Sequence, residues 1–471
     1  MQALPVRPVT LGAPLGRVPA TVTSPADGPA KPKSAWNLGA AQLDGTGVLF
    51  CLYLLLIFLE FTGLPNQYAI LKVTRLSTII SYSLVLIALA KAGLTDVLAN
   101  RSAKLLIGFF VFTVLSVLWA FIRLYAINSI RPLVDYLGLM IITGCYLDRR
   151  SRMNWFAATF SLIAVWLVGL NFEKLTSGGP RIGHFEAPYF MGDGNDLAWW
   201  LALALPFALS LVFGKCSWLQ RGIGAAGAAA CLVGVMGTTS RGAFMGLGSA
   251  FLYGWLFVSK KKALGTILVV AVALVMLVIA PSGYFARMNT VTNYQEDNSA
   301  QSRIKAWTAG LHMAMDHPLG VGAGNFSSVN GRYYLNQPGR WFNAHSIYFK
   351  VLGEYGFLGL AMLLATILSL LQLNGRSRRA ILANPEDAPL SHYWPGFLNM
   401  SVIAFALCGV FLGGFNYPHL FVLTGLCIAT QRVIRLESTG GTGETSRAPV
   451  SAAGAIRPGV APIATPARRP V

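Results

Sequence analysis

The chain has 471 residues, of which 54% are hydrophobic and only 12% are charged, and its mean hydropathy is +0.56. Soluble domains carry about 25% charged residues, so this composition excludes an ordinary soluble protein and indicates a helix bundle in lipid. The formal net charge of +19 could favour nucleic acid, but the basic residues are scattered between apolar runs and do not gather on one polar face. We therefore predict an all-α polytopic membrane protein that binds membrane lipids and no nucleic acid.

Both ends of the chain differ in composition from its middle. Residues 1–46 are rich in Pro, Ala, Gly and Val and lack an apolar region followed by a small-residue cleavage site, which predicts a disordered cytoplasmic tail and not a signal peptide. Residues 437–471 share this bias and are predicted to form a second disordered cytoplasmic tail. The segment between them, 47–436, is then the membrane domain.

Long apolar runs fill the membrane domain, at about 20 residues per crossing. They predict about twelve transmembrane helices, at roughly 47–61, 76–91, 105–122, 131–147, 154–172, 197–213, 222–239, 242–258, 263–280, 346–371, 396–413 and 417–431. If the N-terminus is cytoplasmic, the basic clusters between alternate spans all fall on the cytoplasmic side, in agreement with the positive-inside rule. This pattern predicts that both termini are cytoplasmic.

A set of basic residues violates this rule, because it falls on the outer face. The set includes Arg181, Arg241, Arg303, Lys305 and Arg340, and it gathers in the loops after the fifth, seventh and ninth spans. Repeated positive charge at this face indicates a functional need for it, such as binding an anion. The alternative is that outer loops carry a few arginines for contact with lipid headgroups.

Two of the outer loops are long, running from Glu173 to Asp196 and over the predicted periplasmic loop 281–345. In the second loop, Ser302 is predicted to cap a helix from Arg303, with an apolar stripe of Ile304, Trp307, Leu311 and Ala314 or Met315. The glycines of 320–324 that follow could suggest a phosphate-binding loop. No preceding strand or Walker lysine accompanies them, which disfavours that interpretation.

His345 is a candidate general base. It lies where the polar loop gives way to the next apolar helix, with Asn343 as a plausible cap, so we expect it in the first turn. The positive end of the helix dipole there favours the neutral imidazole that a base requires. The alternative is a histidine at the membrane interface that only hydrogen bonds to loop backbone, and the residue alone favours this alternative.

Arg241 separates two apolar spans that are joined by a very tight turn. An arginine so close to hydrocarbon is costly unless it pairs or faces a wet cavity, and no Asp or Glu lies within a helical turn of it in the sequence. A bound anion such as pyrophosphate would be an adequate partner, because the planar guanidinium delivers two hydrogen bonds together with charge. The alternative is a structural arginine bound to backbone carbonyls.

Several short segments follow one another on the predicted outer face. They are Arg181 with Gly192-Asp-Gly-Asn-Asp-Leu-Ala198, Thr239-Ser-Arg-Gly-Ala243, Ser302-Arg303 to Trp307 with Asp316-His-Pro-Leu-Gly320, and Ala344-His345-Ser346 followed by Leu352-Gly-Glu-Tyr-Gly-Phe-Leu-Gly359. Together they resemble the O-antigen ligase and polymerase family, polytopic glycosyltransferases that use undecaprenyl-pyrophosphate glycans as donors. Gly194 departs from the pattern, since relatives often carry Pro there. The last segment is also similar to exosortase-associated ligase-like members.

This resemblance implies a bacterial inner-membrane glycosyltransferase of the O-antigen ligase type, with its active site at the periplasmic face and no cofactor. His345 would take the proton from a hydroxyl of the acceptor, a glycan or lipid A-core, which attacks the donor sugar with inversion. Three arginines would hold the leaving pyrophosphate without a metal ion: Arg181, Arg241 and Arg303. Lys305 and Arg340 are lesser candidates for contact with glycan or phosphate, and Glu354 is expected to be structural.

Three alternatives stay open. A polymerase that joins repeat units would use the same donor and differ only in its acceptor. A transporter would need ionisable groups near the middle of the membrane, whereas the acidic residues fall at predicted span ends or in loops. A non-catalytic membrane scaffold would tolerate changes of the outer-face arginines and His345.

Overall fold

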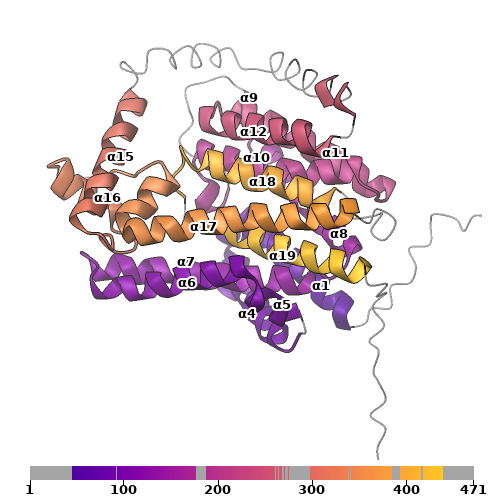
Figure 1. Ribbon diagram of the computed structural model, residues 1–471, viewed down its shortest axis with the longest axis horizontal. Helices are drawn as coiled ribbons and strands as arrows, with labels where there is room; N and C mark the ends of the chain where they lie inside the picture. The colour runs from indigo at the N-terminus through magenta and orange to yellow at the C-terminus, as the bar shows by residue number, and fades with distance from the viewer. Residues whose placement is uncertain are drawn as a thin grey trace, which may run out of the picture. The chain divides into compact units, whose positions relative to one another are not determined.

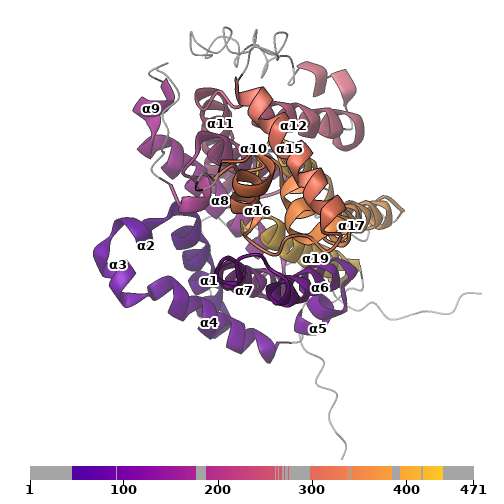
Figure 2. The same cartoon turned by 90° about the vertical axis from the view of Figure 1, so that its left-hand side faces the viewer.

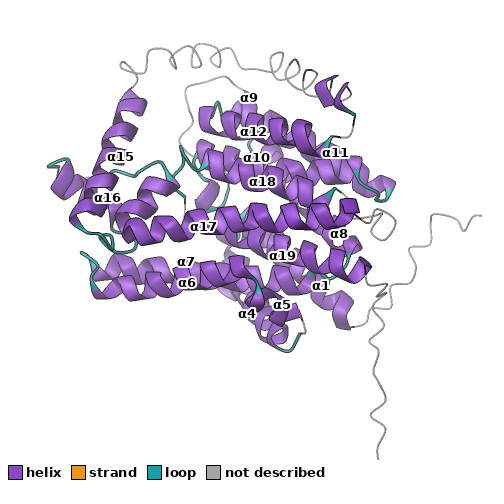
Figure 3. Ribbon diagram, viewed as in Figure 1, coloured by secondary structure: helices purple, strands orange, loops and turns teal. Residues whose placement is uncertain are grey.

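The computed structural model describes residues 45–438 except 92, 177–186, 260, 264, 268–269, 271–273, 275–297, 338, 340, 384–392 and 415–416. Contacts divide the chain into two units, Met1–Gly47 and Val48–Val471, and the helices lie in the second unit except for the first three residues of α1. The predicted tails, apart from a few residues at their inner ends, and most of the predicted span 263–280 lie outside the described residues. The residues that the structure describes form helices joined by loops, with no strand among them (Figure 3).

The helices follow one another as in Figure 1. The longer ones are α1 (Gly45–Thr62), α4 (Leu76–Leu89), α6 (Arg101–Leu115), α7 (Arg123–Tyr146), α8 (Arg150–Leu170), α10 (Gly194–Phe213), α11 (Trp218–Gly237), α12 (Arg241–Tyr253), α15 (Asn298–Asp316), α17 (Ile347–Ala383), α18 (Trp394–Cys408) and α19 (His419–Ser438). Short helices connect them: α2 (Leu64–Gln67), α3 (Ala69–Thr74), α5 (Gly93–Ala99), α9 (Phe172–Thr176), α16 (Phe326–Val329), the 3-10 helices η1 (Ser116–Leu118) and η2 (Tyr189–Met191), and the π-helices η3 (Gly254–Val258) and η4 (Asn330–Tyr334).

Seven stretches among the described residues are long and apolar enough to cross a membrane. They are Ala69–Leu89, Arg101–Leu118, Arg150–Leu170, Gly194–Phe213, Trp218–Gly237, Ile347–Leu382 and His419–Glu437, while the segment Gly47–Thr62 of α1 and the helix α18 are apolar but shorter. The all-helical, multi-pass architecture predicted from the sequence is therefore confirmed. The number of twelve spans stays a prediction, because α7 carries three charged residues and α12 has 13 residues before it continues as η3.

The centre of the bundle is α10, which packs against α8, α11, α12 and α18. This helix is apolar on every side, as expected of a helix surrounded by others. Its two tryptophans, Trp199 and Trp200, are fully buried. Aromatic rings from four helices surround them, including Phe61, Phe160 and Phe405. This core holds the ends of the neighbouring helices in fixed positions.

α17 is broken near its beginning, at Gly356. The backbone of Gly356 has φ 64° and ψ −164°, a region that essentially only glycine occupies, and a Cβ there would overlap the carbonyl of Pro318. The loop after α15 fills the break: the amides of Val321 and Gly322 donate to the carbonyls of Gly353 and Glu354 at 2.9 and 3.0 Å. The glycines of 320–324 therefore serve close packing, Gly320 against α17, Gly322 against Ala120 and Gly324 against α7, in agreement with the view that they are not a phosphate loop.

Glu354 supports this loop from inside. Its side chain is buried, and Oε1 accepts a hydrogen bond from the amide of Phe326 at 3.4 Å. Phe326 belongs to a small hydrophobic cluster, separate from the main core, that also contains Met313 of α15, Val321 and Ala344. The contacts of Glu354 agree with the structural role expected for it.

Two details of α15 differ from the prediction. The helix begins at Asn298, so Ser302 lies inside it and does not cap it. Its buried face consists of small residues and one methionine, whereas Ile304 and Met315 are 43% and 59% exposed. The buried residues are Ala306, Ala309, Gly310, Met313 and Ala314. Small side chains allow α15 to approach α17 closely. The apolar stripe could not indicate this packing, because it was identified from large apolar residues at helical spacing.

Candidate functional site

His345 lies just outside α17. The helix begins at Ile347, which makes Ser346 its flanking residue, so the prediction that His345 is in the first turn was wrong by two positions. Asn343 does not cap the helix but lies against Gly413. The amide of Ile347 instead donates to the carbonyl of Gly409 at 2.9 Å. The start of α17 is thus fixed by the loop that follows α18.

The backbone of His345 adopts a left-handed conformation, with φ 47°. Few non-glycine residues do so, although histidine is enriched among them, and such conformations cost on the order of 1–3 kcal/mol. They persist where the surroundings over-determine them and cluster at functional sites. The neighbours Ala344 and Ser346 are buried while His345 itself is exposed, so this turn directs the imidazole out of the packed core.

Trp307 of α15 holds this turn in place. Its indole Nε1 donates to the carbonyl of Ala344 at 3.0 Å. Its ring stacks on Phe349 of α17, with 5.1 Å between centroids and an interplanar angle of 8°. A third aromatic, Phe411 from the loop after α18, lies 6.3 Å from Trp307. The residue before His345 is therefore fixed by a side chain from α15.

Arg241 lies at the tight turn between α11 and α12, where the sequence predicts it. α11 ends at Gly237, Thr239 is left-handed with φ 52°, and the hydroxyl of Ser240 caps α12. Arg241 is the first residue of α12 and is half-buried. Its neighbour Gly242 packs on Phe411, where an added Cβ would come within 2.9 Å of the Phe411 Cβ.

Phe411 and Trp307 thus join three predicted segments, and we name these two residues with Ala344 the aromatic junction. Arg241 precedes the glycine that contacts Phe411, Arg303 is half-buried one turn before Trp307 on α15, and His345 follows Ala344. Figure 2 shows α15 lying against α17, the helix on which it packs. The contacts bring together the segments that carry three of the predicted site residues.

The remaining candidates are placed differently. Lys305 is exposed on α15, two residues after Arg303. Arg181 and Arg340 lie outside the described residues, so their predicted roles stay predictions. Among the residues that the structure describes, no group of three or more His, Cys, Asp or Glu side chains could hold a metal ion.

Sequence reasoning missed a polar pair at the same end of the bundle. Tyr417 Oη donates to Asp196 Oδ2 at 2.8 Å, which connects the beginning of α10 with the chain before α19. Asp196 belongs to one of the segments that carry the family resemblance, but nothing in the sequence indicates its partner 221 positions away. His419 lies beside this pair, buried among Phe61, Phe190 and Trp199.

A second polar pair lies at the far end of α15. Tyr334 Oη donates to Asp316 Oδ2 at 2.7 Å. Burial and, after it, the hydrogen bond and negative charge of Asp316 raise the pKa of the Tyr334 phenol. The phenol therefore stays neutral and fastens η4 to α15.

The structure defines a class: a multi-pass helical membrane protein whose polar loops converge on an aromatic junction at one end of the bundle. Residues 226–364 match the O-antigen ligase family, which confirms the resemblance drawn from the sequence. The match includes Arg241, Arg303, Trp307 and His345, whereas Arg181 lies outside it. A comparison with curated proteins gave no match.

Proposed function

We propose that the chain, a membrane enzyme of the O-antigen ligase or polymerase type, transfers a glycan from an undecaprenyl-pyrophosphate donor to an acceptor hydroxyl. One observation carries the proposal: the three family segments with Arg241, Arg303 and His345 converge on Phe411 and Trp307. Cationic and basic side chains at one place are what transfer from a pyrophosphate requires.

In the proposed reaction His345 acts as the general base. It accepts the proton of the acceptor hydroxyl, whose oxygen forms a bond to the anomeric carbon of the donor sugar. The bond from that carbon to the pyrophosphate oxygen breaks on the opposite face, which inverts the configuration and releases undecaprenyl pyrophosphate. Two observations support this role. His345 is exposed, so a substrate can reach its imidazole, and the preceding carbonyl of Ala344 is held by Trp307, so the backbone that carries the base is fixed.

Arg241, Arg303 and Arg181 are proposed to hold the pyrophosphate and to stabilise its developing charge without a metal ion. Guanidinium groups do this through paired hydrogen bonds and full positive charge. Arg241 and Arg303 are half-buried, so part of their hydration is already replaced by protein. Lys305 and Arg340 are proposed to make weaker contacts with glycan or phosphate.

The proposed location is the periplasmic face of the bacterial inner membrane, with both termini cytoplasmic. Support comes from the charge distribution along the helices. The ends of α6, α8, α17 and α19 remote from the aromatic junction carry most of the basic clusters, including Arg101, Arg150, Arg376 and Arg432. The positive-inside rule places those ends in the cytoplasm and the junction outside.

A polymerase is the second candidate, because it would use the same donor and differ from a ligase only in its acceptor. Both activities would use the same base and the same pyrophosphate site. Their products differ: a ligase attaches a complete polymer to the acceptor, and without a polymerase only a single repeat is attached. The pattern of cell-surface glycans therefore separates the two.

The deciding experiment replaces His345 by Ala in the full-length protein and compares cell-surface glycans on a gel in a strain that lacks the wild-type gene. We expect transfer to be abolished while the protein stays inserted in the membrane at its normal level. Loss of all polymer on a normal acceptor identifies a ligase, and a single attached repeat identifies a polymerase. His312→Ala is the matched control, because His312 is exposed on α15. Wild-type glycans from His345→Ala would refute the mechanism.

A further inference from the structure

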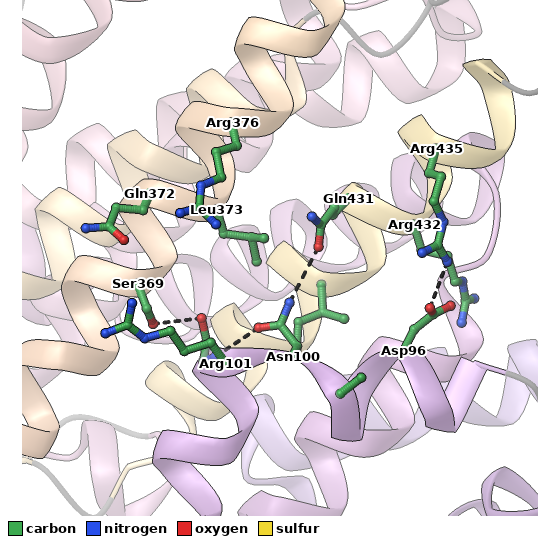
Figure 4. Close-up of a pocket in the computed structure, with 13 residues that line it drawn as sticks. Asp96, Asn100, Arg101, Ser369, Gln372, Leu373, Arg376, Gln431, Arg432 and Arg435 are labelled. Carbon is green, nitrogen blue, oxygen red and sulfur yellow. Dashed lines mark hydrogen bonds and ion pairs between the residues drawn. The ribbon is translucent and has the colours of Figure 1, made fainter.

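A second polar site lies at the end of the bundle remote from the aromatic junction. A cavity of about 290 Å³ opens there between α5, α6, α17 and α19. Its polar lining comes from all four helices: Asp96, Asn100, Arg101, Ser102, Ser369, Gln372, Arg376, Gln431, Arg432 and Arg435. Figure 4 shows Arg101 and Arg376 on one side and Arg432 and Arg435, beside Asp96, on the other. This group of residues is named the arginine pocket.

The described residues that line the arginine pocket carry more positive than negative charge. Asp96 is the single carboxylate in the lining, and it pairs with Arg435 at 2.7 Å. Arg432 is buried, 8% exposed, and donates to the carbonyl of Cys145 at 3.2 Å. Within the described part of the chain, Arg101 and Arg376 form no hydrogen bond or ion pair. Four guanidinium groups around one carboxylate leave room for an anion.

The beginning of α6 adds to this positive potential. Asn100 caps the helix by accepting from the amide of Ser102 at 2.9 Å, and Arg101 is the first helical residue. The helix dipole therefore places partial positive charge at the pocket. Neutral polar groups fix the walls: Ser102 and Ser369 share a hydrogen bond of 2.7 Å, and Asn100 contacts Gln431. The site is built from hydrogen-bonded side chains and is not a loose surface cluster.

Position along α17 separates this pocket from the candidate active site. Arg376 lies twenty positions after the break at Gly356, which corresponds to about 30 Å of helix, the thickness of the hydrocarbon core. Exposed apolar residues directly precede or follow lining residues in the sequence: Leu98 precedes Ala99, Leu368 precedes Ser369 and Leu436 follows Arg435. An anion site with apolar neighbours at the edge of the hydrocarbon layer matches a molecule that has a charged head and an apolar tail.

We propose that the arginine pocket binds the phosphate of an anionic phospholipid headgroup in the leaflet opposite the candidate active site. The phosphodiester occupies the space between Arg101, Arg376 and Arg432, and the acyl chains run along the exposed leucines. Basic pockets between helices on the cytoplasmic side recognise such headgroups. The proposal does not depend on glycan transfer.

The test titrates the purified full-length protein, in a neutral detergent, with phosphatidylglycerol and follows the bound lipid by native mass spectrometry. We expect one tightly bound phosphatidylglycerol, at least about tenfold preferred over phosphatidylcholine with the same acyl chains, because the net charge of the headgroup decides binding. The double variant Arg101→Gln, Arg376→Gln should lose this preference. Neither arginine has a partner among the described residues, so the variant should keep the unfolding midpoint of the lipid-free protein.

The matched control is the double variant Lys104→Gln, Arg379→Gln. Both residues are exposed, lie on α6 and α17 like the pair in the pocket, and do not line it. This control removes the same charge from the same end of the bundle, and it should retain the preference. Equal loss in both double variants would mean a general surface attraction and would overturn the proposal. So would inorganic phosphate at equal concentration displacing the lipid completely, since the site would then take free phosphate.

Discussion

Replacing Trp307 by Phe tests whether the aromatic junction positions His345. The substitution keeps a ring to stack on Phe349 but removes the indole N–H that donates to Ala344 at 3.0 Å. The lost hydrogen bond is worth about 0.5–1.5 kcal/mol of stability, which a large membrane protein tolerates. Its effect on activity should be larger, because a displacement of about 1 Å in a catalytic group can cost on the order of 10²-fold in rate.

The assay measures glycan transfer in isolated membranes at matched protein levels, together with the unfolding midpoint of the purified protein. We expect Trp307→Phe to lower the transfer rate at least about tenfold while the midpoint changes little, and Trp307→Ala to lower both, because the stacking energy of about 0.5–1.5 kcal/mol is lost as well. Trp218→Phe is the control, since Trp218 is 73% exposed at the start of α11. A wild-type rate for Trp307→Phe, or an equal loss in the control, would refute the reasoning.

Four further substitutions test other parts of the structure. Gly356→Ala should lower the unfolding midpoint markedly, because a non-glycine residue in this backbone conformation costs about 1–3 kcal/mol and its Cβ would overlap the loop after α15. Gly375→Ala is the control and should leave the midpoint unchanged, because a Cβ there meets nothing within 4 Å. Equal midpoints for the two variants would contradict the assigned packing. Arg241→Lys and Arg303→Lys should each reduce transfer about tenfold, because a point charge does not replace a bidentate fork; full activity in both would remove the pyrophosphate site from the mechanism. Tyr334 has a raised pKa, so the unfolded chain ionises first and stability should fall as the pH rises above about 10. Tyr334→Phe should remove that part of the alkaline loss, and unfolding midpoints with the same pH slope as wild type would argue against it.

The helices could be predicted from the sequence because helices that cross a lipid bilayer consist of long apolar runs. An apolar run of about 20 residues has few alternatives to a helix when every backbone group must be hydrogen bonded internally. The predicted ranges accordingly fall on observed helices wherever the structure describes them, except that few residues of 263–280 are described. The tight turn at Arg241 was also predictable, because two apolar runs there leave only a few polar residues between them.

The orientation of α15 and the turn at His345 could not be predicted from the sequence. Hydrophobic periodicity assigns the large apolar residues to the buried face, yet close packing against α17 selects the small ones, including Ala306 and Gly310. The left-handed conformation of His345 depends on contacts from distant segments. Trp307 on α15 lies 37 positions from Ala344, and Gly409 at the end of α18 lies 62 positions from Ile347. No local pattern encodes such a constraint, because it arises only when distant segments meet.

The arginine pocket shows a limit of charge counting. Arg101, Arg376, Arg432 and Arg435 were all accounted for in the sequence as charge that orients helices, and the positive-inside rule explains their side of the membrane. Charge that orients a helix and charge that binds an anion give the same sequence pattern, since both concentrate at helix ends. Burial and pairing distinguish them: Arg432 is 8% exposed and the one carboxylate in the lining already pairs with Arg435. A charge that only orients a helix does not need to line a cavity, whereas Arg101 and Arg376 line the same cavity as the buried Arg432, and this shared lining makes the pocket a binding site to test.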